Sequence, residues 1–322
     1  MKKSTIQTIL ATLAVFACVW LAGTMFGHSV KSALGGSPQA VINPPNQNYV
    51  AVVFISGPIQ NSAPNPLSIS PQYYNHRATI SYIYSLIDDA NNTGIFLEIN
   101  TPGGGVYETD ELYLALMNYR AQTGRPIYAF MHSYAYSGGY YAAMAAEHIG
   151  VNRNTMTGSI GVIMTHVSYA GMYEEQGIVI DYITSGENKA MGAEGNTLSE
   201  EQRAIYQAIV DESFDQFVGI VCEGRGLDEE TVRTIADGRI YTASQALELN
   251  LIDEITTHDE LFIAFCTDLN SIYYAPNLTE YSFLQQILSA TETIALKNEM
   301  ESLQEIMESF QPGVPLYMYT GV

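Results

Sequence analysis

A serine followed by two glycines stands where a strand-like run gives way to a helix-like run. Ser137 comes shortly after the segment PIYAFM, and the segment YYAAMAAE follows its two glycines. Such a strand-to-helix turn is a typical position for a nucleophile, because the free N–H groups of the helix stabilise nearby negative charge. The position also suits an N-cap, whose hydroxyl accepts a backbone N–H and does no chemistry. A nucleophilic role for Ser137 therefore requires a residue that takes its proton.

Lys189 is the strongest candidate for that proton acceptor. It is the only lysine between residues 32 and 296, a region with eight arginines, and it lies in the glycine-flanked segment TSGENKAMG. A lysine acts as a general base only when neutral, and burial in an apolar site lowers its pKa by several units. Arginine cannot replace it, because its pKa stays above about 12. A Ser-His arrangement that uses His166 is the alternative.

Acyl transfer also needs donors for the developing oxyanion. The segment NTPGGG, residues 100–105, lies at the C-terminal end of an expected parallel strand, where the sites of α/β proteins gather. Glycine lets the backbone approach a substrate closely, so the N–H groups of Gly104 and Gly138 are the natural pair of donors. Taken alone, PGGG is more typical of a turn, and its interpretation depends on Ser137 and Lys189.

Strand-like and helix-like runs alternate through the region that contains these residues. This alternation predicts an α/β fold built from βαβ units with a mostly parallel sheet. The main strands are expected at 49–59, 94–100 and 126–131, and short ones at 148–152, 161–166 and 179–184. The helices are expected at 80–92, at 109–124 and directly after Ser137.

Two capping boxes predict where later helices begin. Ser199 with Gln202 opens a long helix that Gly224 is placed to end, and Thr242 with Gln245 opens a shorter one. Residues 268–322 form a separate C-terminal region. We expect a helix near 282–309 there, followed by a terminal strand in PGVPLYMYTGV.

The N-terminus has the pattern of a membrane anchor. Residues 4–27 contain no charged side chain and are mostly apolar, which is long enough to span a bilayer. Lys2 and Lys3 precede this run, so the positive-inside rule keeps residues 1–4 in the cytoplasm and sends the rest outside. We therefore expect a single-pass anchor at 5–27 in the cell membrane and a linker at 28–48. A cleaved signal peptide is the alternative.

Composition excludes some partners and cofactors. Acidic residues outnumber basic ones by 34 to 13, a net charge of −21, which argues against nucleic acid because phosphate contacts need clustered lysine and arginine. The six histidines are scattered and no CxxC pair is present, so neither a metal nor a cofactor is expected. The sequence leaves open whether Cys222 and Cys266 pair.

Five segments, taken in order, resemble the bacterial signal peptide peptidase A (SppA) family of membrane-anchored serine–lysine peptidases. They are INTPGGGVYETDELY, YSGGYYAA, TGSIGVI, SGENKAMG and ADGRIYTASQALELNLIDEI, within residues 49–267. The resemblance implies a peptidase domain over 49–267 with repeated ββα units, related in fold to the Clp protease and crotonases. It also implies roles for Ser137 (nucleophile), Lys189 (general base), Gly104 and Gly138 (oxyanion hole) and Ser159 (holding the lysine amine).

The resemblance carries further expectations about substrates and assembly. It implies a short, single-domain form that degrades hydrophobic peptides such as cleaved signal peptides. It also implies a homo-oligomer in which neighbouring subunits complete the dyad. Tyr136 departs from the alanine that the family commonly has before the nucleophile, and this side chain could narrow the adjoining pocket.

Three other readings stay open at the level of sequence. One is a peptidase that uses Ser137 with His166. Another is a catalytically inactive scaffold or regulator of the same fold. The third is a coenzyme A-dependent crotonase, which the expected outward orientation disfavours because that cofactor is cytoplasmic.

Overall fold

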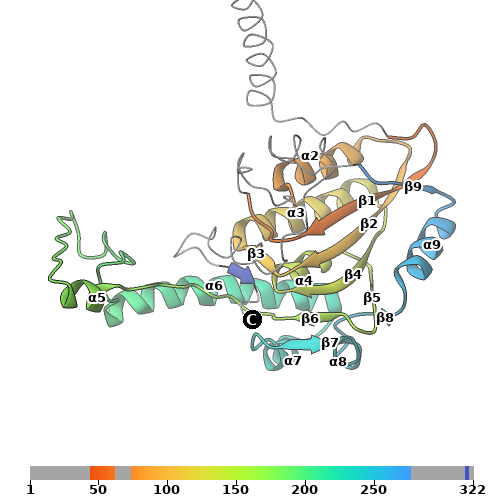
Figure 1. The fold of residues 1–322 in the computed structure, drawn as a ribbon. Helices are drawn as coiled ribbons and strands as arrows, with labels where there is room; N and C mark the ends of the chain where they lie inside the picture. Colours follow the sequence, from red (N-terminus) through yellow and green to blue (C-terminus); the bar gives the residue numbers. More distant parts are fainter. Residues whose placement is uncertain (1–43, 62–73, 277–315, 319–322) are drawn as a thin grey trace, which may run out of the picture.

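The computed structural model describes residues 44–61, 74–276 and 316–318 of the chain (Figure 1). Eight strands form one sheet in the order β7-β6-β4-β2-β1-β9, with β5 between β4 and β8. The long central strands are β1 (Tyr49–Ser56), β2 (Asn92–Thr101) and β4 (Ile127–Tyr136). The short ones are β5 (His148–Val151), β6 (Met156–Gly158), β7 (Ile240–Thr242), β8 (Glu254–Ile255) and β9 (Ile272–Tyr274).

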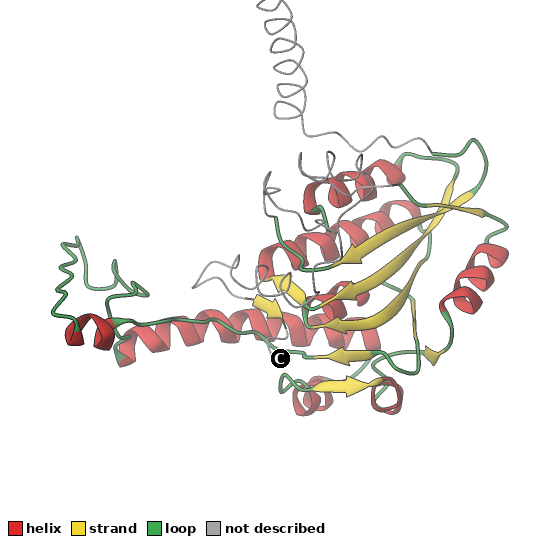
Figure 2. Cartoon of the chain, viewed as in Figure 1, coloured by secondary structure: helices red, strands yellow, loops and turns green. Residues whose placement is uncertain are grey.

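The sheet is mostly parallel, as the alternating runs predicted. Only the pair β6–β7 is antiparallel. Strands alternate with α2 (His76–Ile87), α3 (Val106–Thr123) and α4 (Gly138–Ala143), which pack on one face (Figure 2). This mixed α/β arrangement fits the Clp protease/crotonase-like fold that the resemblance implied.

The two faces of the sheet have separate cores because side chains alternate along each strand. On β2, Ile95 and Leu97 join the large core under α2, α3 and α4. Phe96 points to the other face and packs beneath α9 (His258–Asp268). Cys222 contacts the first core and Cys266 the second, and both are free thiols.

Both predicted capping boxes are confirmed. Ser199 and Gln202 cap α6 (Glu200–Arg225), while Thr242 and Gln245 cap α8 (Ala243–Glu248). The predicted end of the long helix is wrong by two residues. Helix α6 continues through Gly224 to Arg225. Gly226 caps it in the left-handed conformation (φ 65°) that favours glycine. The short helix α7 (Glu229–Ile235) follows.

A second, small sheet lies beside the first. The strand β3 (Gly103–Gly105) pairs antiparallel with β10 (Leu316–Met318), and Tyr317 stands opposite Gly104. The predicted terminal strand is therefore confirmed over three residues. The helix expected near 282–309 lies outside the described residues.

A long extension projects from the body of the protein. It consists of α5 (Ala170–Glu175), the loop after it and the first half of α6 (Figure 1). We call residues 165–212 the projecting arm, and none of these residues is buried. The 26 residues of α6 span about 39 Å at about 1.5 Å per residue. The far end of the arm is therefore well separated from the sheet.

Two predicted strands are absent because they fall beside or within this arm. Residues 161–166 contain no strand, and residues 179–184 form an exposed loop. The latter segment has apolar residues in a strand-like pattern, but no strand among the described residues covers it: Val179 is 82% exposed and Ile183 fully exposed. An apolar strand-like pattern therefore does not by itself place a segment in the sheet.

The predicted membrane anchor at 5–27 lies outside the described residues. Across the ranges that are described, no helix has both the length and the hydropathy needed to cross a bilayer.

Candidate active site

Ser137 occupies a strained turn between β4 and α4. Its φ of 49° and ψ of −112° place a non-glycine residue in a conformation that costs on the order of 1–3 kcal/mol. The turn is held because the Ser137 N–H donates to Gly158 O at 2.8 Å and its carbonyl accepts from Tyr141 N–H at 2.9 Å. Such strain is typical of turns that display a nucleophile.

The Ser137 hydroxyl does not cap the helix. Its side chain makes no capping hydrogen bond to α4, and its Oγ donates instead to Gly161 O at 3.4 Å. The alternative in which the Ser137 hydroxyl serves only as a helix N-cap is therefore wrong. Gly161, which the sequence analysis did not single out, lies within the motif TGSIGVI.

Ser159 lies beside Ser137 because of the register of two parallel strands. Tyr136 at the end of β4 pairs with Gly158 at the end of β6, so the next residue on each strand is a serine. Ser159 is 5% exposed and also has a positive φ of 51°. Its N–H donates to Arg239 O at 2.8 Å, which fixes the turn from the other side.

The glycine strand β3 reaches the same end of the sheet. A bridge joins Gly104 to Ile59, and a Cβ atom at Gly104 would lie 1.9 Å from Ile59 O. Helix α4 packs against β3, and a Cβ at Gly139 would lie 2.5 Å from the Thr101 methyl group. The fold thus brings Gly104, Gly138 and Ser137 to one end of the parallel strands.

Lys189 lies elsewhere, on the loop of the projecting arm. It is exposed, and its N–H donates to Gly186 O at 3.1 Å. The preceding residues contact the start of α6, where Asn188 donates to Glu201 at 3.3 Å. A single chain therefore places the candidate base on the arm and the candidate nucleophile in the body.

His166 is also on the arm. It lies near Gly192, whose added Cβ would be 3.9 Å from the His166 ring, and its Nε2 atom is buried without a partner. Within the described ranges, no hydrogen bond or ion pair joins Ser137 to either His166 or Lys189. Among the described residues of one chain, neither candidate base contacts the Ser137 hydroxyl.

Comparison with known proteins identifies the family. Residues 119–268 match the family described as Peptidase family S49. A candidate signal peptide peptidase SppA from Enterococcus faecium is 35% identical over 83% of this chain and 80% of its own length. The chain belongs to peptidase family S49, the SppA family.

More distant relatives of this S49 peptidase are longer proteins. The chain is 29% identical to Protease 4 of Haemophilus influenzae over 54% of its length, and this covers 28% of that protein. It is 28% identical to the chloroplastic serine protease SPPA of Arabidopsis thaliana over 65% of its length, or 31% of that protein. These matches support the assignment of the chain as a serine peptidase.

The aromatic residues after Ser137 belong to the core of the S49 peptidase. Tyr140 and Tyr141 are fully buried, and Met144 is 2% exposed. The Tyr140 hydroxyl donates to Leu251 O at 2.8 Å, and burial raises the pKa of this phenol well above its usual range. These residues hold α4 in place and do not line a substrate pocket.

Proposed function

We propose that this S49 peptidase cleaves extended hydrophobic peptides, such as cleaved signal peptides, with a serine–lysine dyad shared between neighbouring subunits. The observation that carries the proposal is the separation of the two candidate groups. Ser137 is fully buried in a strained turn of the body, whereas Lys189 is exposed on the arm. The resemblance to SppA peptidases, in which neighbouring subunits complete the dyad, explains this separation.

The reaction runs through an acyl-enzyme. The Ser137 Oγ attacks the peptide carbonyl while the neutral Lys189 amine of a neighbouring subunit takes the proton and passes it to the leaving amine. Water then hydrolyses the ester by the same proton transfers in reverse. The N–H groups of Gly104 and Gly138 stabilise the oxyanion, and Ser159, next to Ser137 in register, orients the lysine.

Docking of the arm also supplies the environment that a lysine base needs. An exposed amine is protonated near neutral pH, because the ordinary pKa of lysine is about 10.4. Moving Lys189 from solvent into the buried surroundings of Ser137 would desolvate the amine, and burial disfavours the charged form of a lysine. Assembly would therefore position the base and favour its neutral form.

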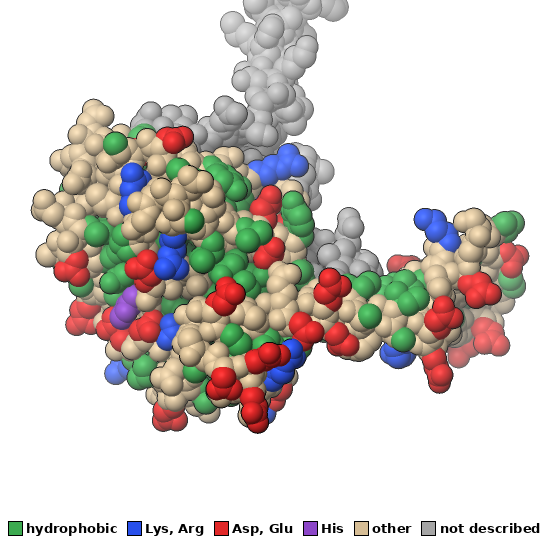
Figure 3. Space-filling model, turned by 180° about the vertical axis from the view of Figure 1, so that it is seen from behind, with side chains coloured by type: hydrophobic (Ala, Val, Ile, Leu, Met, Phe, Trp, Pro, Cys, Tyr) green, Lys and Arg blue, Asp and Glu red, His purple; other side chains and the backbone are tan. Residues whose placement is uncertain are grey.

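The surface of the arm supports such docking. Contiguous exposed apolar surface marks interaction sites, and hydrophobic side chains lie along the arm (Figure 3). Around its tip, large apolar side chains between 40% and 100% exposed are Val167, Tyr169, Met172, Ile178, Val179, Ile180, Tyr182 and Ile183. A monomer gains nothing from exposing these side chains, whereas a neighbouring subunit would bury them.

Pairing along β3 supports an extended peptide as the substrate. The segment Leu316–Met318 already lies antiparallel on the glycine strand, next to α4. A substrate that adds a strand in the same way would be held by its backbone and would lie close to Ser137. With the anchor at 5–27, the peptidase domain would work on the extracytoplasmic side of the cell membrane, near hydrophobic peptides.

Mixing two inactive variants tests the shared dyad. In the full-length protein in mild detergent, Ser137→Ala and Lys189→Ala should each lower hydrolysis of a hydrophobic fluorogenic peptide by at least about a thousandfold. Subunits that are co-assembled in equal amounts should regain about a quarter of the parent activity, because one interface in four pairs an intact serine with an intact lysine. A mixture that co-assembles but stays inactive would refute a dyad shared between subunits.

His166→Ala is the matched control, since His166 also lies on the arm. It should keep most of the parent activity, whereas loss with His166→Ala and retention with Lys189→Ala would indicate the Ser-His mechanism. A fluorophosphonate probe should label Ser137 in the assembled parent. A folded, assembled parent that is neither labelled nor active would favour the scaffold reading.

A further inference from the structure

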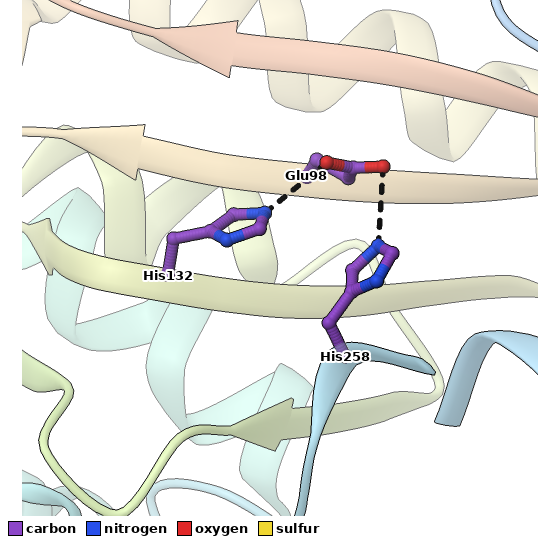
Figure 4. A group of neighbouring side chains, drawn as sticks. All are labelled: Glu98, His132 and His258. Carbon is purple, nitrogen blue, oxygen red and sulfur yellow. Dashed lines mark hydrogen bonds and ion pairs between the residues drawn. The ribbon is translucent and has the colours of Figure 1, made fainter. Parts of the chain in front are cut away.

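Two histidines and a glutamate meet on the face of the sheet that α9 covers. Glu98 comes from β2, His132 from β4 and His258 from the first turn of α9 (Figure 4). One ligand atom from each lies within 4.8 Å of the others. This face is opposite to the one that packs α4 behind Ser137. The cluster therefore lies outside the proposed active site.

Both imidazole rings direct the same nitrogen at the one carboxylate. The distance from His132 Nε2 to Glu98 Oε2 is 3.1 Å, and that from His258 Nε2 to Glu98 Oε1 is 3.3 Å (Figure 4). Ligand atoms of a tetrahedral zinc site, about 2.0–2.1 Å from the ion, are about 3.3 Å apart. The ring centroids of His132 and His258 are 5.6 Å apart, with 28° between the planes. Small side-chain rotations would bring the three ligands around one ion.

His258 has a carboxylate beside each of its two ring nitrogens. Its Nε2 faces Glu98, and its Nδ1 faces Asp259 Oδ1 at 2.9 Å. With a metal on Nε2, the proton stays on Nδ1 and is donated to Asp259, the arrangement in which a carboxylate orients a metal-binding histidine.

Aromatic side chains surround the two histidines and fix their orientation. Phe130 contacts both rings edge-on, with centroids 5.2 Å from His132 and 5.4 Å from His258. Phe262 stacks on His258 at 5.4 Å, and Phe96 meets it edge-on at 5.7 Å. The ligands remain open to solvent, since the side chains of Glu98, His132 and His258 are 15%, 36% and 29% exposed. An ion can therefore enter a site whose ligands are already positioned.

We propose that Glu98, His132 and His258 bind one divalent transition-metal ion, with Zn²⁺ as the best match. Two imidazoles and one carboxylate are a common zinc ligand set, and a fourth position is left for water. The bound ion ties the start of α9 to strands β2 and β4. The proposal assigns the ion this link between elements and no catalytic step, so it does not depend on the peptidase mechanism.

The test measures metal binding by the full-length, tag-free protein in mild detergent after removal of metal with a chelator. Calorimetric titration with Zn²⁺ should give one ion per chain, and Zn²⁺ should raise the melting temperature. Co²⁺ should give the visible spectrum of a low-coordinate nitrogen–oxygen site. His132→Gln, His258→Gln and Glu98→Gln should each weaken Zn²⁺ binding by at least about a hundredfold, since even loss of an outer-shell partner costs about 10–100-fold.

His148→Gln is the matched control. His148 also pairs with one glutamate, Glu254 at 2.7 Å, and has a similar exposure of 31%. This variant should bind Zn²⁺ as the parent does. The absence of stoichiometric binding by the parent would overturn the proposal, whether or not the variants fold. So would binding that the three ligand substitutions leave unchanged, which would identify adventitious surface binding.

Discussion

Single residues at the candidate site are fixed by backbone contacts more than by side chains. The carbonyl of Ile59 passes so close to Gly104 that any Cβ atom there would overlap it. Ser137 is held in a strained conformation with positive φ by hydrogen bonds to Gly158 and Tyr141. A substitution at either place therefore alters the position of the backbone, including the N–H groups proposed to bind the oxyanion.

Gly104→Ala should reduce both stability and activity. The Cβ atom would lie 1.9 Å from Ile59 O, and relief of that overlap should cost about 1–3 kcal/mol, which thermal unfolding would detect as a fall of several degrees. Peptide hydrolysis should fall by about a hundredfold or more, because one oxyanion donor moves.

Gly219→Ala is the control for this substitution. An added Cβ at Gly219, on the exposed side of α6, meets nothing within 4 Å. Alanine should stabilise that helix by about 0.5–1 kcal/mol relative to glycine. Equal melting temperatures for the two variants would contradict the close approach at Gly104.

At the same scale, the sequence identified some candidate residues and missed others for physical reasons. Ser137, Gly104 and Lys189 stand in local motifs, so their types and neighbours identify them as candidates. The cluster of Glu98 and His258 has no such signal, because 160 positions separate its members and only the fold joins them. The expectation of no metal site came from this lack of local spacing.

Among the elements, the terminal strand β10 has the most direct bearing on function. It lies antiparallel on β3, where an extended substrate is proposed to bind. A segment of the same chain competes with substrate at a high effective concentration. The S49 peptidase would then hold back its own activity by occupying the glycine strand.

Deletion of residues 310–322 should lower the apparent KM for a hydrophobic peptide by roughly tenfold, since millimolar effective concentrations are typical of tethered segments. The value of kcat should stay the same, because a competing segment affects binding and not the chemical step. Deletion of 319–322 alone keeps β10 and should leave KM near that of the parent. Steady-state kinetics of the three proteins would decide, and an unchanged KM in the longer deletion would count against occupation of β3.

Most elements could be predicted because apolar periodicity and capping residues are local. The strands at 49–56 and 127–136 and the capped starts of α6 and α8 follow from such patterns. The apolar run at 179–184 has the same local pattern but forms an exposed loop. Apolar periodicity indicates that one side of a segment packs against another surface, but it does not identify that surface.

At the scale of the whole molecule, the two proposed catalytic groups lie in different parts of the protein: Lys189 on the projecting arm and Ser137 in the body. The body has a core on each face of its sheet, whereas residues 165–212 contain no buried residue. In the proposed assembly, another subunit covers the exposed apolar side chains at the tip and brings its Ser137 to the arm. Apolar patterns alone do not predict the exposure of these side chains, because they do not distinguish burial within a chain from burial between chains.

A double substitution, Val179→Asp with Ile183→Asp, should prevent assembly. Both side chains are more than 80% exposed in one subunit, and charges there would be costly to bury against a neighbour. Light scattering should show smaller particles, peptide hydrolysis should be lost, and the circular dichroism of the folded body should be unchanged.

Ile263→Asp on α9 is the control, since Ile263 is 62% exposed on the body. It should assemble and cleave as the parent does. Full assembly and activity in the arm variant would show that the arm tip is not the contact between subunits.

The position of Lys189 on the arm has a consequence for when the peptidase becomes active. With the dyad shared, an isolated subunit lacks a base beside its own serine and is latent without any inhibitor or propeptide. The hydrolysis rate per subunit would fall on dilution and rise more than in proportion to the amount of protein in the membrane. Newly made subunits would then stay inactive until their number in the membrane exceeded the level needed for assembly.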